Sequence, residues 1–399
     1  MTKNITVIGI NYYPEDSAIG LYTTQKVEAL ASKGHKVTVI TGFPYYPAWQ
    51  INKEYKTKPY LFEEEFNGVR VLRSKQYVPK KPTFFKRVVH LISFTFGNLI
   101  NLFKLQNRPD LIISIVPFTT SILLGLILKI RYRSILWVHV QDFEFDVAKQ
   151  SGLNPKNILL YKLLIYIEKK LLNSADIVST ISHSMIEVLK QKSNSEPFFL
   201  PNWIDNKKEI KFTSHRYLKS NKVKVLYSGN IGEKQDWDAF FKFCQQISTE
   251  RYEIVVVGDG AKKDWVVNNT KLFSHVKCFP PVPLNELSSL LRSTDFHILF
   301  QKTGIIDAVM PSKILGMMAS SRPSIIVGNR NSEIKTIFNS CSPGIFFDTY
   351  SKQIIVELDR LVDNPHEMEK MGKSAYKYVT ANFSKNNVLN EFLKKINFL

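Results

Sequence analysis

Short runs of apolar residues alternate along the chain with longer segments in which apolar residues recur every three or four positions. In the first half, the apolar runs cover residues 5–10, 35–41, 110–116, 134–140 and 175–182. Helical patterns follow them, such as the one over Tyr22–Lys33. This alternation is typical of a doubly wound parallel α/β sheet.

The same rhythm restarts after a polar, basic stretch at residues 200–222, with apolar runs at 223–229, 252–260, 275–281, 294–300 and 322–328. We therefore expect two Rossmann-like domains, 1–203 and 204–381. An amphipathic helix at 382–399 could pack back on either domain, and we expect the N-terminal one. Open parallel sheets bind ligands beyond the carboxyl ends of their strands, so the expected site is a cleft between the two sheets.

One apolar stretch raises the question of a membrane span. Residues 111–128 carry no charge, but Pro117 and several hydroxyl residues lie in the middle. A buried strand, a turn and a core helix explain this stretch at least as well as a spanning helix. The N-terminal residues 1–15 predict a first strand and not a signal peptide, and three dispersed cysteines favour a reduced, cytoplasmic setting.

The net charge adds information about the binding partner. The 399 residues include 54 Lys and Arg against 35 Asp and Glu, a formal charge of +19. Such an excess implies an anionic partner, which could be nucleic acid, a membrane surface or a phosphorylated substrate. No helix-turn-helix, zinc or RNA-binding signature is present, so nucleic acid is not the expected partner.

The strongest local motif is a glycine loop at residues 226–237, LYSGNIGEKQDW. Gly229, Asn230 and Gly232 follow a strand, and Lys234 precedes a helix. Glycines allow the backbone to approach a phosphate, with N–H groups pointing at it and a lysine supplying charge. A tight strand–helix turn with a solvated lysine is the alternative.

A second cationic helix start lies in DAVMPSKILGMMASSRP, residues 307–323. Pro311 suits the first helical position, and Ser312 and Lys313 stand in the first turn, where free N–H groups favour an anion. Gly316 then interrupts an apolar helix at a cost of about 1 kcal/mol relative to Ala.

Other strand ends carry weaker candidates. Gly20 stands at a strand–loop–helix junction, Gly258 and Gly260 end an apolar strand, and His139 and Asp142 lie at the end of another. A helix start, a turn and a structural histidine are the respective alternatives. No second histidine stands at ligand spacing from His139, so we expect no metal site.

A basic and aromatic stretch at residues 77–108 predicts a membrane-surface helix. An ordinary core helix with a basic outer face is the alternative. The residues expected at the membrane surface are Lys80, Lys81, Phe84, Phe85, Lys86 and Arg87.

Several motifs together resemble one family: GINYYPEDSAIGLYT, GHKVTVITGFPYYPAWQ, QYVPKKP, HVQDFEFD, STISHSM, FLPNWID, LYSGNIGEKQ and MPSKILGMMAS. Over nearly its whole length the chain resembles the family 4 retaining glycosyltransferases of the GT-B fold. Within them it is most similar to bacterial colanic acid and other exopolysaccharide fucosyltransferases. The resemblance implies an acceptor-binding first domain and a second domain that binds a nucleotide-sugar donor.

The resemblance also implies site roles. Lys234, Lys313, His139 and Asp142 would act in catalysis. The donor would be bound by Gly20, Gly229, Asn230, Gly232, Gly258, Gly260, Val282, Pro283, Leu284, Asp307 and Ser312. Within this set, Gly20 and Ser312 would lie near the diphosphate, and residues 280–287 would border the base.

The chain departs from the family pattern at one place. Many members carry two glutamates eight positions apart, whereas the corresponding positions here are Ala308 and Gly316, with Asp307 one residue from the first. We do not transfer the roles of those glutamates.

The resemblance implies transfer of L-fucose from GDP-fucose, with retention, onto a lipid-linked saccharide in polysaccharide synthesis. No metal or other cofactor is expected. The protein would work at the inner face of the cytoplasmic membrane. A UDP-sugar donor, N-acetylfucosamine or another hexose, and a non-catalytic nucleotide- or polyanion-binding protein at the membrane surface are the alternatives.

Overall fold

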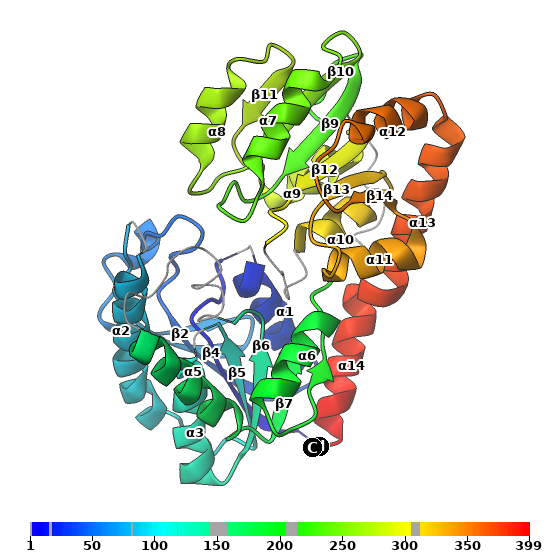
Figure 1. The fold of residues 1–399 in the computed structure, drawn as a ribbon. Helices are drawn as coiled ribbons and strands as arrows, with labels where there is room; N and C mark the ends of the chain where they lie inside the picture. Colours follow the sequence, from blue (N-terminus) through cyan, green and yellow to red (C-terminus); the bar gives the residue numbers. More distant parts are fainter. Residues whose placement is uncertain are drawn as a thin grey trace. The chain divides into compact units, whose positions relative to one another are not determined.

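The computed structural model describes residues 2–15, 18–80, 83–117, 119–143, 158–204, 214–304 and 312–399. The chain divides into two compact units. Unit 1 comprises Met1–Pro201 with Leu389–Leu399, and unit 2 comprises Asn202–Val388. Figure 1 shows the elements of each unit in chain order.

The described part of unit 1 is built on an eight-stranded sheet with the strand order β3-β4-β2-β1-β5-β6-β7-β8. Its strands are β1 (Asn4–Ile8), β2 (Lys36–Gly42), β3 (Leu61–Phe66), β4 (Val69–Ser74), β5 (Leu111–Val116), β6 (Ile135–Val140), β7 (Ile177–Thr180) and β8 (Phe198–Phe199). The strands pair in parallel except for the β3–β4 hairpin. Asn67 and Gly68 form its turn with φ angles of 51° and 74°, the conformation that a two-residue hairpin requires.

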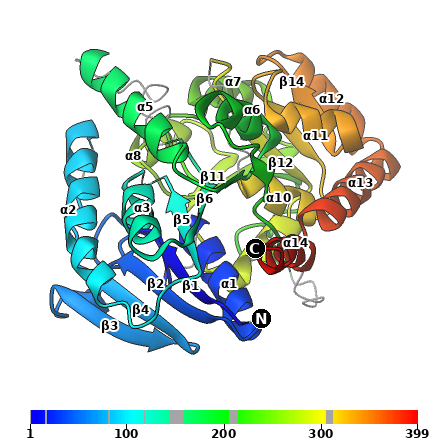
Figure 2. The ribbon, with the colours of Figure 1, turned by 90° about the horizontal axis from the view of Figure 1, so that it is seen from below.

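Helices cover both faces of this sheet. They are α1 (Ala18–Ser32), α2 (Phe84–Phe103), α3 (Thr120–Tyr132), α5 (Ile158–Leu172), α6 (His183–Lys192) and α14 (Lys385–Asn397), with a 3-10 turn η1 (Lys53–Tyr55). Figure 2 shows α2 and α3 on one face and α1 on the other. The C-terminal helix α14 packs on this unit, where the Phe392 ring lies 5.4 Å from the ring of Trp137.

The described part of unit 2 has a six-stranded, fully parallel sheet in the order β11-β10-β9-β12-β13-β14. Its strands are β9 (Val223–Ser228), β10 (Tyr252–Val257), β11 (Val276–Phe279), β12 (Phe296–Phe300), β13 (Ser324–Val327) and β14 (Gly344–Phe347). Its helices are α7 (Trp237–Gln246), α8 (Lys263–Thr270), α9 (Leu284–Arg292), α10 (Ser312–Ala319), α11 (Glu333–Cys341), α12 (Gln353–Val362) and α13 (Pro365–Phe383).

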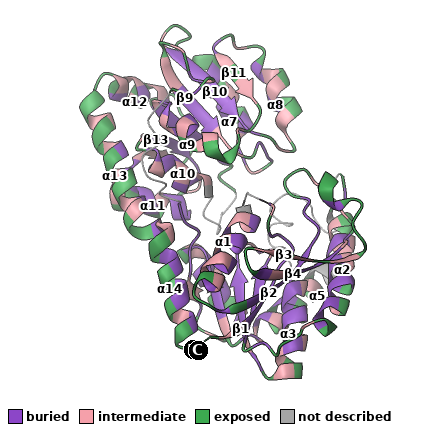
Figure 3. Cartoon of the chain, turned by 180° about the vertical axis from the view of Figure 1, so that it is seen from behind, coloured by how far each residue is buried: buried purple, intermediate pink, exposed green. Residues whose placement is uncertain are grey.

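The apolar runs of the sequence are the buried strands of both sheets (Figure 3). Strand β10, for example, is buried at all six positions, as expected for a central parallel strand with helices on both faces. Residues 111–128 form β5 and most of α3, as the strand–turn–helix interpretation predicted. Among the described residues, no helix is long and apolar enough to cross a membrane.

Candidate functional site

The glycine-rich strand ends of unit 2 lie at one edge of its sheet. Because β11, β10 and β9 are neighbours and run in parallel, the loops that follow them come together at their carboxyl ends. These loops are residues 229–236, 258–262 and 280–283. This edge is where ligands of open α/β sheets bind.

The first two loops contact each other backbone to backbone. The N–H of Ile231 donates to the carbonyl of Asp259 at 2.8 Å, and the N–H of Lys262 donates to that of Ile231 at 2.9 Å. A Cβ at Gly258 would come within 2.0 Å of the Gly229 carbonyl oxygen, closer than real Cβ contacts allow. Glycine at position 258 is therefore a requirement of this loop contact.

The N–H groups of both glycines in the glycine loop are engaged within the protein. Gly229 donates to Val257 at 2.9 Å, and Gly232 donates to the side-chain oxygen of Gln235 at 3.0 Å. The expectation that these N–H groups point at a phosphate is therefore not met in this structure. The glycines instead let neighbouring loops approach closely, and the positive side chains nearby can meet an anion.

Hydrogen bonds to the end of β12 fix the loop that carries Lys234. The N–H of Lys302 donates to the Lys234 carbonyl at 3.1 Å, and the N–H of Asp236 donates to Phe300 at 3.0 Å. The indole N–H of Trp237 donates to the Gly232 carbonyl at 3.0 Å. These bonds fix the backbone of Lys234, and Lys234 is half-buried.

Lys313, in the first turn of α10, lies over the glycine loop. Its ammonium nitrogen is 3.2 Å from the Tyr227 hydroxyl and 4.9 Å from the centre of that ring. The Lys313 Nζ is also 3.4 Å from where a Cβ of Gly229 would stand. The structure thus brings together Lys313 and Gly229, which are far apart in the sequence.

Tyr227 contacts both Lys313 and the glycine loop, and the sequence analysis did not identify it. Its hydroxyl donates to the carbonyl of Asn230 at 2.6 Å, and burial raises the pKa of this phenol. The inward position of a tyrosine at the end of a buried strand is the signal that could have indicated it. The neutral ring provides a cation–π surface for the Lys313 ammonium.

Two predicted donor residues around α10 lie outside what the structure describes, namely Asp307 and the side chain of Ser312, the first residue of α10. Ala308 and Pro311 also lie outside the described residues. Gly316 is described, and a Cβ there would lie 3.2 Å from Leu291 Cδ1 of α9. The absence of a side chain at Gly316 lets α9 and α10 approach each other.

The predicted base-binding segment separates β11 from α9. Val282 packs on a buried cluster that includes Leu226 and Val257. Pro283 precedes the first turn of α9, and Leu284 at its start is 49% exposed. This segment therefore presents an exposed apolar side chain beside the two glycine loops.

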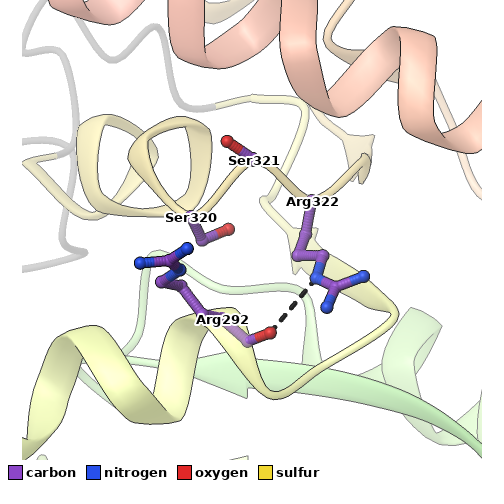
Figure 4. Close-up of a pocket in the computed structure, with 4 residues that line it drawn as sticks. All are labelled: Arg292, Ser320, Ser321 and Arg322. Atoms are coloured by element: carbon purple, nitrogen blue, oxygen red, sulfur yellow. Dashed lines mark hydrogen bonds between the residues drawn. The ribbon is translucent and has the colours of Figure 1, made fainter. Parts of the chain in front are cut away.

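The cavity drawn in Figure 4 is separate from this edge. It has a volume of 280 Å³ and is lined by Arg292, Ser320, Ser321 and Arg322. These residues precede β13, so the cavity lies toward the amino ends of the strands. The Arg322 Nε donates to the Arg292 carbonyl at 3.1 Å across it.

In unit 1, the predicted catalytic His139 lies inside a buried polar cluster. Its Nε2 is 2.8 Å from the Lys26 ammonium nitrogen, and its Nδ1 is 2.9 Å from the Ser179 hydroxyl. Burial lowers the pKa of Lys26 to about 7 and, with the nearby lysine, lowers that of His139. Only 1% of His139 is exposed, so in this structure the ring positions its neighbours, and a direct catalytic role stays a prediction.

Asp142 follows two residues after the end of β6 and is half-buried. Its carboxylate accepts a hydrogen bond from the N–H of Phe143 at 2.9 Å. The neighbouring acidic residues Glu144 and Asp146 lie outside the described residues.

Gly20 packs on a buried carboxylate, Glu15, which the sequence reasoning missed. A Cβ at Gly20 would come within 2.8 Å of the Glu15 Cβ. One Glu15 oxygen accepts from the N–H groups of Tyr45 and Tyr46 at 2.7 and 2.8 Å, and the other accepts from Asn11 at 2.7 Å. Burial raises the pKa of Glu15, and the carboxylate ties the loop after β2 to the start of α1.

The predicted membrane-surface residues surround the start of α2. Lys80, Phe85 and Lys86 are exposed, whereas the Arg87 guanidinium lies 5.5 Å from the centre of the Trp49 ring. Lys81 and the side chain of Phe84 lie outside the described residues. Within the described part of the chain, no group of three or more His, Cys, Asp or Glu could hold a metal ion.

Comparison with known proteins identifies the family to which this chain belongs. A glycosyl transferase 4-like domain matches residues 17–203, and a glycosyl transferases group 1 domain matches residues 208–378. The chain belongs to the family 4 glycosyltransferases, as these two domains and a relative that is 32% identical over nearly the whole chain show.

That relative is the putative colanic acid biosynthesis glycosyl transferase WcaI of Escherichia coli K12. The match covers 98% of this chain and 99% of WcaI. The probable glycosyltransferase WbjE of Pseudomonas aeruginosa is 24% identical over 53% of this chain and 55% of its own.

Solved structures share the fold at low sequence identity. Sucrose-phosphate synthase of Thermosynechococcus elongatus matches with a TM-score of 0.71 and 14% identity, covering 99% of this chain and 98% of its own. Anabaena HepE, solved with UDP and glucose, matches with a TM-score of 0.70 and 12% identity over 100% of both chains. Together with the two parallel-sheet units, these matches confirm the predicted GT-B fold.

Proposed function

We propose that this glycosyltransferase transfers L-fucose from GDP-fucose, with retention of configuration, to a lipid-linked saccharide. The product would enter capsule, exopolysaccharide or O-antigen synthesis. The observation that carries the proposal is the placement of Lys313 over Gly229 at the carboxyl edge of the unit 2 sheet. The likeness to WcaI, named for colanic acid biosynthesis, supports the polysaccharide context.

In this mechanism the bond from the sugar C1 to the diphosphate breaks while a bond from C1 to an acceptor oxygen forms on the same face. The acceptor proton passes to the leaving diphosphate. Negative charge develops on that leaving group, and the ammonium groups of Lys313 and Lys234 stabilise it. In this proposal the two lysines supply the stabilisation without a metal ion.

The remaining donor and acceptor contacts follow from the same assignment. Leu284 and Val282 would border the base. The acceptor would bind to unit 1, near Gly20, His139 and Asp142. A lipid-linked acceptor would bring the protein to the inner face of the cytoplasmic membrane, with Lys80, Phe85 and Lys86 near the headgroups.

A UDP-sugar donor is the second candidate, because HepE was solved with UDP and with UDP-glucose. A melting-temperature screen with GDP-fucose and several UDP-sugars distinguishes the two. Stabilisation by GDP-fucose supports the proposal, and stabilisation by UDP-sugars alone rejects that donor. Proton NMR of the transfer product then reports whether the anomeric configuration is retained.

A non-catalytic nucleotide- or polyanion-binding protein would bind these ligands without turnover. Release of free GDP that depends on the acceptor rejects this alternative. Nucleic-acid binding that is salt-sensitive and tighter than nucleotide binding would favour it.

A further inference from the structure

Beyond its first turn, the solvent face of α2 is apolar. Its exposed large side chains, with 48% to 73% of their surface accessible, are Phe85, Ile92, Phe96, Ile100 and Phe103. At 3.6 residues per turn, these positions fall within a stripe about 80° wide. A helix that packs on a sheet normally turns its polar side to water, so this stripe is unusual.

The buried face of the same helix contains the polar residues. His90, Thr95, Asn98 and Asn101 are all buried, and the side chains of Thr95 and Asn98 bond to carbonyls within the helix. From Val88 to Phe103 the sequence contains no Asp, Glu, Lys or Arg. The helix thus buries polar residues beside the apolar Leu91, Phe94 and Leu102, while its exposed face is apolar beyond the first turn. An exposed face of this kind indicates contact with an apolar medium.

Two neighbouring helices extend this surface. On α3, Leu123 and Ile130 are exposed seven residues apart, and on α5 the exposed residues are Leu163, Tyr166 and Ile167. Helix α3 packs against both α2 and α5, and Figure 2 shows the three along one side of unit 1. We call the outer surface of α2, α3 and α5 the three-helix face. It carries ten of the twenty large exposed apolar residues in the described chain.

The charges around the three-helix face are mostly positive. Its helices and their ends carry Lys86, Arg87, Lys104, Lys129, Arg131, Lys162, Lys169 and Lys170, of which Lys129 pairs with Asp176 at 2.6 Å. Their sequences contain one acidic residue, Glu168, which is buried and pairs with Lys192 at 2.6 Å. The Arg131 guanidinium lies 5.1 Å from the centre of the exposed Phe103 ring, so cation and aromatic groups adjoin.

We propose that the three-helix face binds an anionic lipid bilayer, with its apolar side chains inserted among the headgroups and its lysines on lipid phosphates. Apolar stripes flanked by Lys and Arg bind membranes in this way. A protein partner fits less well, because lysine is depleted in protein interfaces. A second copy would place two basic faces against each other. The proposal rests on the proposed function, since a lipid-linked acceptor requires access to a bilayer.

Vesicle flotation of the full chain tests the proposal. Wild-type protein should float with vesicles that contain phosphatidylglycerol and remain in solution with phosphatidylcholine alone. The triple variant Ile92→Gln, Phe96→Gln, Phe103→Gln should lose at least about tenfold in partitioning. The matched control is Leu272→Gln, Val356→Gln, Tyr376→Gln, which changes exposed apolar residues of unit 2 and should float like wild type.

A charge variant tests the contribution of the lysines to bilayer binding. Lys162→Glu, Lys169→Glu, Lys170→Glu should also reduce partitioning by at least about tenfold, because each basic residue near an anionic surface contributes. Lys352→Glu, an exposed position of unit 2, is its control. All variants alter exposed side chains, so their melting temperatures should match the wild type and exclude misfolding.

Two outcomes overturn the proposal. One is unchanged flotation of both triple variants. The other is a lipid-free dimer that the apolar variant converts to a monomer, which would assign the face to a second copy. Stabilisation by GDP-fucose, measured on the same samples, separates the two proposals. Flotation without nucleotide-sugar binding rejects the function, and nucleotide-sugar binding without flotation rejects the bilayer face.

Discussion

The two parallel sheets end in different ways at their carboxyl edges. In unit 2 the strands β9 and β10 run into glycine loops that touch backbone to backbone, with the ammonium of Lys313 above them. In unit 1 the corresponding ends hold buried polar side chains, among them Glu15, which follows β1 and accepts from the loop after β2, and Lys26, which contacts His139. Glycines shape the carboxyl edge of the unit 2 sheet, whereas buried ionisable side chains shape that of unit 1.

This difference indicates two ways of preparing a site. Glycines let the loops of unit 2 pack closely on each other, and the charge of a diphosphate is then met by a few lysines. A buried carboxylate or amine instead fixes the backbone around it, because leaving its hydrogen bonds unmade would be costly. We therefore expect substitutions in unit 2 to change donor binding, and those in unit 1 to change loop order and stability.

The largest effect is expected for the lysines of unit 2. Lys313→Ala and Lys234→Ala should each reduce the transfer rate by about 10²- to 10³-fold, because each removes a cation from the leaving diphosphate. Initial rates with GDP-fucose measure this loss. Lys352→Ala, at an exposed position outside the site, should match the wild type. Near-wild-type transfer by both site variants would show that the donor site does not lie at the carboxyl edge of the unit 2 sheet.

The loop contact comes next. Gly258→Ala should weaken donor binding by about a hundredfold, since a Cβ 2.0 Å from the Gly229 carbonyl must displace the glycine loop. Gly304→Ala is the matched control, because no atom of the described residues lies within 4 Å of its added Cβ. Titration calorimetry with GDP gives both affinities. Equal affinities for the two variants would contradict the argument from close approach.

A smaller effect is expected at Glu15 of unit 1. Glu15→Gln places a donor group against the Asn11 amide and should cost about 1–3 kcal/mol of stability. Chemical denaturation measures this loss, with the exposed Glu65→Gln as the control. Donor affinity should stay at the wild-type value. A donor defect with unchanged stability would place Glu15 in the donor site instead.

The last prediction concerns the pH dependence of stability, a change in slope and not in activity. Burial lowers the pKa of Lys26 from 10.5 to about 7, so the unfolded chain binds the extra proton between these values. The free energy of unfolding should therefore rise with pH across that window, by up to about 1.4 kcal/mol per pH unit. Lys26→Met should remove this rise, whereas Lys36→Met at an exposed position should keep it. An unchanged slope in Lys26→Met would show that the buried amine is not its source.

Much of the fold could be predicted because parallel strands are continuous apolar runs. The β3–β4 hairpin was missed, although Asn67-Gly68 is the dipeptide that a two-residue turn favours. The Lys26–His139 contact joins residues 113 positions apart, and no local pattern indicates it. Gly229 and Gly258 could be selected as candidates, but which N–H groups are already bonded depends on how neighbouring strands pair.

Equilibrium binding of GDP-fucose by titration calorimetry tests the central claim most directly. The claim is that the donor diphosphate binds beside the glycine loop and pairs with the Lys313 ammonium. Wild type and Lys352→Ala should bind with equal affinity, and Lys313→Ala should bind at least about tenfold more weakly, because an ion pair with the diphosphate is lost. Equal affinity of Lys313→Ala and wild type would contradict the account.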